Sequence, residues 1–162
     1  MSELDNKLHR VCFTGHRPEK LRRDAEHIKS DLEREIRQAS ADGAKVYISG
    51  MARGVDIWAA QIVLKLRDEG EAVKLVCACP YDGFERSWSR EWAEQYRDVL
   101  CRADRVAYIS DRYNSACFRR RNEWMVDHAS IVIAVFNGER SGTKNTVDYA
   151  AKVSVPVVLI DG

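Results

Sequence analysis

The chain has 162 residues, of which 45% are hydrophobic and 31% are charged, a composition typical of one soluble globular domain. Its 26 basic and 25 acidic residues leave a formal net charge of +1, which argues against general nucleic-acid binding through a strong basic excess. No run of about 18 apolar residues is present, and the polar start MSELDNKLHR lacks the apolar core of a signal peptide. We therefore expect a single cytoplasmic domain over residues 1–162 with no membrane association, residues 1–8 forming a flexible N-terminal segment.

The cysteines number five, and an odd count without a secretory signal argues against a disulfide framework. Cys77 and Cys79 share one face of a predicted strand, because side chains alternate along a strand. Neither a CxxC pair nor a histidine cluster lies near them at zinc-ligand spacing, which favours buried structural thiols over metal ligands. We expect neither a metal nor a cofactor.

The first half of the chain alternates apolar segments with segments of helical periodicity. In chain order we predict a strand at Arg10–Gly15, a helix at Glu19–Asp42, a strand at Lys45–Gly50, a helix at Val55–Arg67 and a strand at Ala72–Pro80. Within the first helix Ile28, Leu32 and Ile36 recur every four residues, which places them on one face. Gly43 follows at the position where glycine commonly ends a helix.

The second half continues the alternation. We predict a helix at Phe84–Ala103, a strand at Arg105–Ser110, a helix at Phe118–His128, a strand at Ser130–Gly138, a helix at Thr143–Lys152 and a strand at Val155–Ile160. Trp88, Trp92 and Tyr96 stand at i, i+4 and i+8 of the first of these helices, a stripe more typical of core packing than of a base-stacking surface. Trp88 is the member nearest a strand end, where stacking on a base is the alternative.

This order of elements indicates βαβ units and a mainly parallel sheet with right-handed crossovers. The segment IVIAVF is apolar throughout instead of alternating, as expected for a strand whose two faces are both covered by helices. The predicted fold is therefore an α/β, three-layer Rossmann-like domain with a mainly parallel sheet. Ligands of such sheets bind beyond the carboxyl ends of the strands, so the loops that follow the strands are the places to seek a site.

The first such loop is TGHRPEK. Gly15 ends a strand, and His16 and Arg17 precede Pro18, which favours an extended or turn conformation before it. Two interpretations remain equally open: a strand-exit turn with solvated charges, or a loop that directs His16 or Arg17 into the crevice.

The second loop is ISGMARGVD. It is neither a Walker A loop nor a GxGxxG fingerprint. Gly50 and Gly54 nevertheless allow a ligand to approach the backbone closely, and the helix that follows offers free N–H groups to an anion. Arg53 can contact a phosphate, whereas Asp56 in the first helical turn suits a ribose hydroxyl better than a phosphate. The alternative is a plain turn in which Asp56 only interacts favourably with the positive end of the helix dipole. The physical arguments slightly favour the ligand-binding loop.

The third loop is NGERSGTKNT, in which Gly138 and Gly142 flank polar residues and Thr143 is placed to cap the next helix. Three glycine-bearing loops at one edge of a sheet argue more strongly for a ligand than any one of them. Between the second and third loops, Arg121 and Asn122 lie near the start of a predicted helix. They either reach a ligand or belong to a solvated basic face.

The segments TGHRPEKL, SGMARGVDIWAA, the Trp-rich segment after CP, YNSACFRRRNEWMVDHASIVIAVFNG and the Gly-Thr loop together resemble the YpsA-like branch of the SLOG superfamily. That superfamily joins the Smf/DprA DNA-processing proteins and the LOG phosphoribohydrolases. The resemblance runs from Arg10 to Ile160 and implies a Rossmann-like fold and a nucleotide or nucleotide-derived ligand. It also implies a bacterial protein, a homo-oligomer formed through helices that flank the sheet, and a link to cell division or stress.

The resemblance further implies the composition of the pocket and two departures from it. Gly50, Arg53, Gly54 and Asp56 would line it with Gly142 and Thr143. The superfamily's Gly-Gly-Thr loop is here Ser141-Gly142-Thr143, which alters the close approach to a phosphate.

The second departure concerns catalysis. LOG-type enzymes carry a glutamate two or three residues after that threonine, where this chain has Asn145 and Thr146. Cleavage of an N-glycosidic bond passes through an oxocarbenium-like state that a carboxylate stabilises. Asp56, Glu123 and Asp148 are the carboxylates that could substitute, the first two being our candidate catalytic residues. Arg121 matches the arginine of the LOG motif, so phosphate recognition can persist without the chemistry.

We therefore rank three functions. The first is a nucleotide-binding or nucleotide-sensing domain, the second an enzyme that cleaves an N-glycosidic bond, and the third single-stranded DNA binding as in DprA. The residues expected to contact the ligand are Gly15, His16, Arg17, Ser49, Gly50, Arg53, Gly54, Asp56, Arg121, Asn122, Gly138, Gly142 and Thr143.

Overall fold

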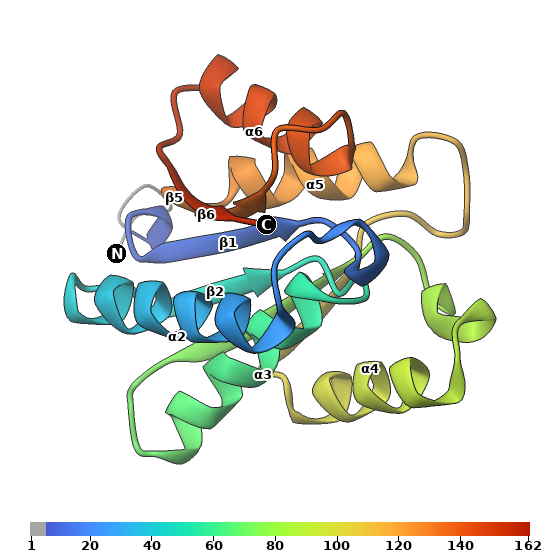
Figure 1. The fold of residues 1–162 in the computed structure, drawn as a ribbon. Helices are drawn as coiled ribbons and strands as arrows, with labels where there is room; N and C mark the ends of the chain where they lie inside the picture. Colours follow the sequence, from blue (N-terminus) through green and yellow to red (C-terminus); the bar gives the residue numbers. More distant parts are fainter. Residues whose placement is uncertain (1–5) are drawn as a thin grey trace.

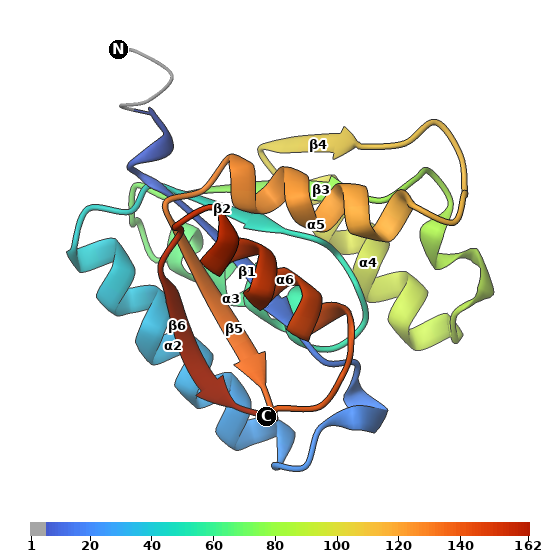
Figure 2. The same ribbon diagram turned by 90° about the horizontal axis from the view of Figure 1, so that it is seen from above.

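A computed structural model describes residues 6–162 and contains one sheet of six parallel strands in the order β4-β3-β2-β1-β5-β6 (Figures 1 and 2). The strands are β1 (Arg10–Gly15), β2 (Val46–Ser49), β3 (Lys74–Cys79), β4 (Arg105–Tyr108), β5 (Ile131–Phe136) and β6 (Val157–Asp161). The helices are α2 (Ala25–Ala41), α3 (Val55–Asp68), α4 (Arg90–Arg102), α5 (Cys117–Asp127) and α6 (Gly142–Lys152), with short 3-10 turns η1 (Pro18–Lys20) and η2 (Phe84–Ser87).

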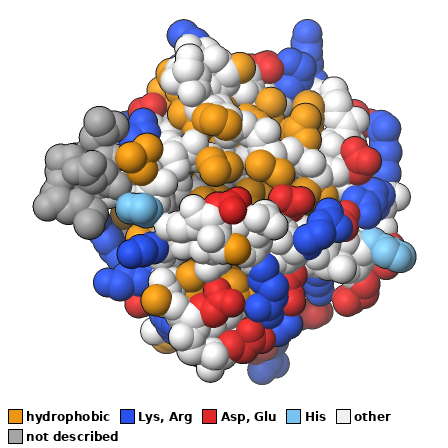
Figure 3. Space-filling view, turned by 90° about the vertical axis from the view of Figure 1, so that its left-hand side faces the viewer, with side chains coloured by type: hydrophobic (Ala, Val, Ile, Leu, Met, Phe, Trp, Pro, Cys, Tyr) orange, Lys and Arg blue, Asp and Glu red, His pale blue; other side chains and the backbone are white. Residues whose placement is uncertain are grey.

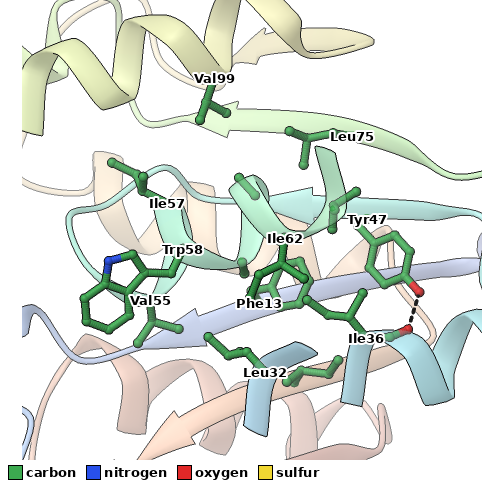
Figure 4. Packing of buried hydrophobic residues seen from close by; sticks show 14 of the residues in the cluster. Phe13, Leu32, Ile36, Tyr47, Val55, Ile57, Trp58, Ile62, Leu75 and Val99 are labelled. Carbon is green, nitrogen blue, oxygen red and sulfur yellow. Dashed lines mark hydrogen bonds between the residues drawn. The ribbon is translucent and has the colours of Figure 1, made fainter. Parts of the chain in front are cut away.

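Helices cover both faces of this sheet, with α2, α3 and α4 on one side and α5 and α6 on the other (Figures 1 and 2). The α2–α3–α4 side holds the larger core, in which Phe13 of β1 packs under α2 and α3 (Figure 4). In the same layer the Tyr47 hydroxyl donates a hydrogen bond to the carbonyl oxygen of Ile36 at 2.9 Å (Figure 4). Cys77 and Cys79 are buried in this layer as well. The predicted three-layer, parallel α/β fold is confirmed.

The order of the strands locates a switch point beside β1. From β1 the chain moves outward through β2 and β3 to β4, and it then returns to the other side of β1 to form β5 and β6. Phe13 of β1 is registered with Ile133 of β5, and Gly15 with Val135. The crevice of an α/β sheet opens where the order reverses, so the loops after β1 and β5 flank the expected ligand position.

The first predicted helix begins later than its sequence indicates. Pro18–Lys20 forms only a 3-10 turn, and Leu21 after it is extended, with φ −77° and ψ 138°. The α-helix starts at Ala25, so the prediction of a helix from Glu19 was wrong by about one and a half turns. The extended residue turns the chain from the carboxyl edge of the sheet back over its face.

The Trp-rich helix is also shorter than predicted. Gly83 adopts the left-handed conformation (φ 89°) and leads into η2, and Trp88 is extended, with φ −83° and ψ 167°. The α-helix begins after Ser89, whose side chain accepts a hydrogen bond from the Trp92 backbone N–H at 3.4 Å. Trp88 therefore precedes the helix, and the predicted stripe at i, i+4 and i+8 was wrong.

The N-terminal segment and the expected lack of membrane association can be compared with the structure only over residues 6–162. Residues 1–5 of the expected N-terminal segment lie outside the described residues, and Asn6 and Lys7 have helical backbone. Within residues 6–162, none of the helices combines the length and apolar character needed to span a membrane.

Candidate functional site

The three glycine-bearing loops meet at the carboxyl edge of the sheet. The first and second loops touch at Gly54, where a Cβ atom would lie 2.8 Å from Cδ of Pro18. The first and third loops are joined by Asn137, whose backbone N–H donates to His16 Nε2 at 3.2 Å and whose side-chain amide donates to the Lys20 carbonyl at 3.1 Å. The loops thus form one continuous surface.

Two glycines of this surface are required by the packing. A Cβ at Gly15 would lie 2.5 Å from Cβ of Val55, so the start of α3 rests directly on the end of β1. Gly54 has φ 88° and ψ −121°, a conformation that residues with a Cβ rarely adopt. Both glycines bring the N-terminus of α3 against the first loop, where its free N–H groups face the crevice edge.

The turn that contains Gly50 is held by Ser49. Its hydroxyl donates to the Asp56 carbonyl at 2.8 Å and accepts from the Met51 backbone N–H at 3.2 Å. Met51 has φ 62° although it carries a buried side chain, a conformation that is costly for a residue with a Cβ. The turn therefore has a strained residue, and the two hydrogen bonds of the buried Ser49 hydroxyl hold it in place.

Asp56 is the buried carboxylate of the site, with 6% of its surface exposed. Its Oδ2 accepts a hydrogen bond from the Ala52 backbone N–H at 3.2 Å, while its Oδ1 is buried with no hydrogen-bond partner. Burial raises the pKa of Asp56 to about 6, against the opposing charge of Arg121 and the Ala52 N–H. An unpartnered buried oxygen costs free energy unless a ligand or water meets it.

Arg121 of α5 is the matching cation, with 5% of its surface exposed. Its Nη1 donates to the carbonyl oxygen of Gly50, and its Nε donates to Oδ1 of Asn122 at 2.7 Å. Burial lowers the pKa of Arg121, and the charge of Asp56 opposes that shift. Because a guanidinium stays protonated in proteins, the site contains a permanent buried positive charge.

The N-terminus of α6 borders the same group of side chains. Ser141 caps the helix by accepting from the Lys144 backbone N–H at 3.2 Å, and the Thr146 hydroxyl donates to the Gly142 carbonyl at 2.9 Å. A Cβ at Gly142 would lie 3.9 Å from Nδ2 of Asn122. Asn122 therefore connects the buried Arg121 to a helix N-terminus that can hold an anion.

Other predicted site residues lie around this centre with different contacts. Arg53 forms an ion pair with Glu19 at 3.0 Å. His16 is buried and stacks on Phe136, and burial lowers its pKa, which favours the neutral imidazole that accepts from Asn137. Arg17 is exposed, and Gly138 forms a left-handed turn with φ 87°. Thr143 is buried inside the start of α6.

The carboxylates considered for catalysis are dispersed. Asp148 pairs with Lys144 at 2.7 Å on α6. Glu123 is half-buried on α5. Among the described residues no group of three His, Cys, Asp or Glu side chains could hold a metal ion. Asp56 is thus the carboxylate beside Gly50 and Arg121.

The prediction that Trp88, Trp92 and Tyr96 pack in the core is confirmed, because Tyr96 is buried and both tryptophans pack against the core, but an exposed aromatic group at the same edge was not predicted. Trp88 packs against Phe84 and Tyr96, with ring centroids 4.8 and 5.3 Å away. Tyr113, in the loop between β4 and α5, and Phe118, in the first turn of α5, are exposed, with 63% and 38% of their surfaces open, as is Tyr108 at the end of β4, with 47%. The available signal was a tyrosine in the polar segment DRYNSA, followed five residues later by a phenylalanine at the start of the helix.

A cavity of about 670 Å³ lies elsewhere, at the amino-terminal edge of the strands. Its walls include Arg10, Ile48, Val76, Arg105 and Trp124. Seen from that edge, hydrophobic side chains gather across the middle of the molecule and charged side chains of both signs lie below (Figure 3). The cavity is remote from the glycine loops, and we place the site at the carboxyl edge because the strand order and the unpartnered Asp56 oxygen both point there.

Comparison with known proteins identifies relatives along most of the chain. The family described as the YspA SLOG family matches residues 11–155. A UPF0398 protein of Bacillus thuringiensis (strain Al Hakam) is 31% identical over 151 residues, which cover 88% of this chain and 82% of the relative. A UPF0398 protein of Bacillus pumilus (strain SAFR-032) is 30% identical over 142 residues, covering 82% and 76%.

Two solved structures share the fold. DNA processing protein A from Helicobacter pylori, described for its single-stranded DNA binding mode, superposes with a TM-score of 0.68 at 20% identity and covers 99% of this chain. DprA from Streptococcus pneumoniae gives a TM-score of 0.68 at 19% identity and covers 96%. This chain spans 68% of the first structure and about half, 51%, of the second.

Proposed function

This chain belongs to the YspA SLOG family, and we propose that it binds a ribonucleotide or a nucleotide derivative in the crevice at the carboxyl ends of β1, β2 and β5. The observation that carries the proposal is the unpartnered Oδ1 of Asp56, buried beside a buried arginine. A ribose hydroxyl supplies the donor that this oxygen lacks. A deoxyribose lacks the 2′-hydroxyl and so offers this oxygen one donor fewer.

The phosphate is assigned to the start of α6. Gly142 leaves room for a close approach, and the first N–H groups of the helix point outward. Asn122 Nδ2 lies beside this position, while its Oδ1 is occupied by Arg121. The ligand then runs from the α6 N-terminus, past Asn122 and Arg121, to Asp56.

Binding or sensing is a better proposal than catalysis. The two positions where LOG enzymes carry their glutamate are Asn145, which is exposed, and Thr146, which is committed to the Gly142 carbonyl. The proposal uses Asp56 as an acceptor for a ligand hydroxyl, and the exposed α6 carboxylate, Asp148, is paired with Lys144. The family assignment itself names no reaction.

A binding panel tests the proposal. Isothermal titration of the full chain with AMP and with dAMP should give tighter binding of AMP, and Asp56→Asn should weaken AMP binding about tenfold and reduce the preference for ribose, as expected for loss of one charge-assisted hydrogen bond. Asp68→Asn, at the far end of α3, is the matched control and should bind as the parent chain does. Absence of stabilisation by mono-, di- and cyclic nucleotides in a thermal-shift panel, with no effect of Arg53→Ala, would refute the proposal.

A second candidate is cleavage of an N-glycosidic bond. It is favoured by a buried carboxyl group whose pKa burial raises to about 6, a value suited to a general acid or base near neutral pH. It predicts free adenine when the protein is incubated with AMP, and loss of that product in Asp56→Asn or Glu123→Gln. Flat product traces across nucleoside monophosphates would remove it.

A third candidate is single-stranded DNA binding. It is favoured by the shared fold with Helicobacter pylori DprA and by exposed aromatic and arginine side chains on one loop and helix, Tyr113, Phe118, Arg119 and Arg120. The net charge of +1 weighs against it. A salt-dependent mobility shift of a labelled oligonucleotide is the deciding measurement.

We also infer that residues 1–162 act as one domain in the bacterial cytoplasm and assemble as a homo-oligomer. The support is the family assignment, the Bacillus relatives and the resemblance to SLOG proteins that associate through helices flanking the sheet. The link to cell division or stress rests on the same resemblance. Light scattering on the purified chain tests the assembly, and a monomer at micromolar concentration would exclude it.

A further inference from the structure

Tyr113 and Phe118 form an exposed aromatic pair at the carboxyl edge of the sheet. Their ring centroids are 6.3 Å apart with planes at 63°, and 63% and 38% of their surfaces are open to solvent. They belong to the segment that returns the chain from β4 to α5, on the right of Figure 1. Exposed aromatic pairs cost hydration free energy and mark surfaces that bind.

A scaffold of rings fixes this pair from below. Tyr81 packs edge-on against Tyr113 at 5.8 Å and against Phe118 at 6.4 Å. Phe84 contacts both Tyr81 and Phe118, at 5.7 and 5.6 Å, and it continues into the buried Tyr96. The two exposed rings are therefore supported by a rigid aromatic cluster, so little side-chain entropy remains to be lost when a ligand binds.

The pair adjoins the site already described through α5. Phe118 precedes Arg121 by three residues and Asn122 by four, so all three lie within about 6 Å of rise along the first turns of this helix. Arg121 contacts Gly50 beside Asp56, and Asn122 lies beside Gly142. Phe118 therefore shares the first turns of α5 with the two side chains that connect Gly50 to Gly142.

The charge around the rings favours an anionic ligand with a planar group. Arg112, Arg119 and Arg120 are exposed on the same loop and helix start, opposed by Asp111 and by the exposed Asp82 next to Tyr81. Glu85, on the neighbouring turn, is buried and paired with Arg97 at 3.1 Å. The surface beside the rings thus carries an excess of positive charge.

We propose that Tyr113 and Phe118 are the base-stacking subsite of the nucleotide crevice, so that the ligand carries a nucleobase, with purines bound more tightly than pyrimidines. This inference rests on the proposed function, since it assigns the third part of the same ligand. The phosphate lies at Gly142, the ribose at Asp56 and the base on the rings. Stacking on an aromatic side chain is tolerant of base identity and grows with ring area.

Titrations of the full chain with AMP, UMP and ribose 5-phosphate test the subsite. AMP should bind more tightly than UMP, and the double variant Tyr113→Ala/Phe118→Ala should weaken AMP binding by about 5- to 100-fold. Its affinity for ribose 5-phosphate, which has no base, should remain that of the parent chain. The single variant Tyr113→Phe should bind AMP as tightly as the parent chain does, because it keeps the ring. Leu159→Ala, which truncates an exposed apolar residue of β6, is the control for loss of surface hydrophobicity.

The outcomes separate this inference from the proposed function. If AMP binding depends on Asp56 but the double variant binds AMP unchanged, the stacking subsite is overturned and nucleotide binding stands. If neither AMP nor ribose 5-phosphate binds, both fail. If a single-stranded oligonucleotide binds in a salt-dependent manner and requires the rings while AMP does not bind, the rings serve DNA and the mononucleotide subsite is overturned. Far-UV circular dichroism establishes that each variant is folded.

Discussion

Asp56 and Arg121 lie on two sides of one glycine: a Cβ atom at Gly50 would be 3.0 Å from Oδ2 of the aspartate and 3.0 Å from Nη1 of the arginine. The two residues are 65 positions apart in sequence and belong to helices on opposite faces of the sheet. They meet because β2 ends between them. The glycine keeps the opposite charges close while its carbonyl oxygen accepts from Arg121.

Gly50→Ala should damage the site more than the fold. The methyl group would press on Asp56 Oδ2, Arg121 Nη1 and Arg121 Cδ, the last at 3.1 Å, and would move both side chains. We expect a loss of stability of about 1–3 kcal/mol and at least tenfold weaker AMP binding. For Gly142→Ala the new methyl would lie 3.9 Å from Nδ2 of Asn122, so its free energy of unfolding should stay within about 1 kcal/mol of that of the parent chain. Equal urea midpoints for the parent chain and Gly50→Ala would contradict the tight packing around that glycine.

The stability of the protein should fall as pH rises through about 6. The pKa of Asp56 is raised by burial from 3.8 to about 6, so the folded state holds a proton that the unfolded state releases between these values. Stabilisation from this group is therefore complete below about pH 4 and is lost above about pH 6, by roughly 2–3 kcal/mol.

Urea titrations of the parent chain and Asp56→Asn from pH 4.5 to 7.5 measure this term. The difference between the two free energies of unfolding should change with an inflection near pH 6, because the amide does not titrate. Parallel curves would show that Asp56 has an ordinary pKa and would remove the buried-carboxylate account.

Affinity for a ribose ligand should have the opposite pH dependence. A hydroxyl donating to Asp56 Oδ1 favours the carboxylate, so affinity should increase as pH rises through about 6 and level off above about 7. Adenosine is the suitable probe, because it has no phosphate that titrates in this range. In Asp56→Asn the affinity for adenosine should be flat with pH; a parent chain that is equally flat would argue that the carboxyl group does not meet the ribose.

Gly15→Ala should destabilise the protein mainly through contact with Val55. The new methyl would lie 2.5–2.6 Å from Cβ, Cγ1 and Cγ2 of that valine, which must move for the chain to fold. We expect a cost of about 1–3 kcal/mol or more. Adding Val55→Ala should recover part of the loss, giving a negative coupling energy in a double-mutant cycle. Additive losses would place the strain elsewhere.

The sequence predicts the fold well because its strands are apolar on both faces and are separated by clear helical periodicity. It places the helix starts less well. Pro18 favours the start of a helix, but the chain makes only one 3-10 turn there, and Gly83 similarly leads into η2 before Ser89 caps the true helix. The first residues of α2 and α4 depend on how the chain turns to pack the helix on the face of the sheet. Local helix propensity does not determine that turn.

The site could be predicted in parts but not in its connections. Gly50, Asp56 and Arg121 were each expected near the crevice from the loops and from the SLOG resemblance. Three features depend on packing between distant elements: Arg121 binds the Gly50 carbonyl, one Asp56 oxygen has no partner, and Tyr113 is exposed. Nothing in the local sequence specifies such contacts.

The central place of β1 ties the site to the order in which the chain is made. One edge of β1 pairs with β2, as Val11 with Tyr47, whereas its other edge pairs with β5, whose register partners lie about 120 residues later, as Val11 with Ile131. Until then an apolar strand edge is open to other chains, and pairings of such long range close slowly. A chain shortened before Ile131 would keep Gly50 and Asp56 yet lose α6 and the cover of β1, and should aggregate. β5 and β6 thus cover the edge of β1 that β2 leaves open, and the third glycine loop follows β5.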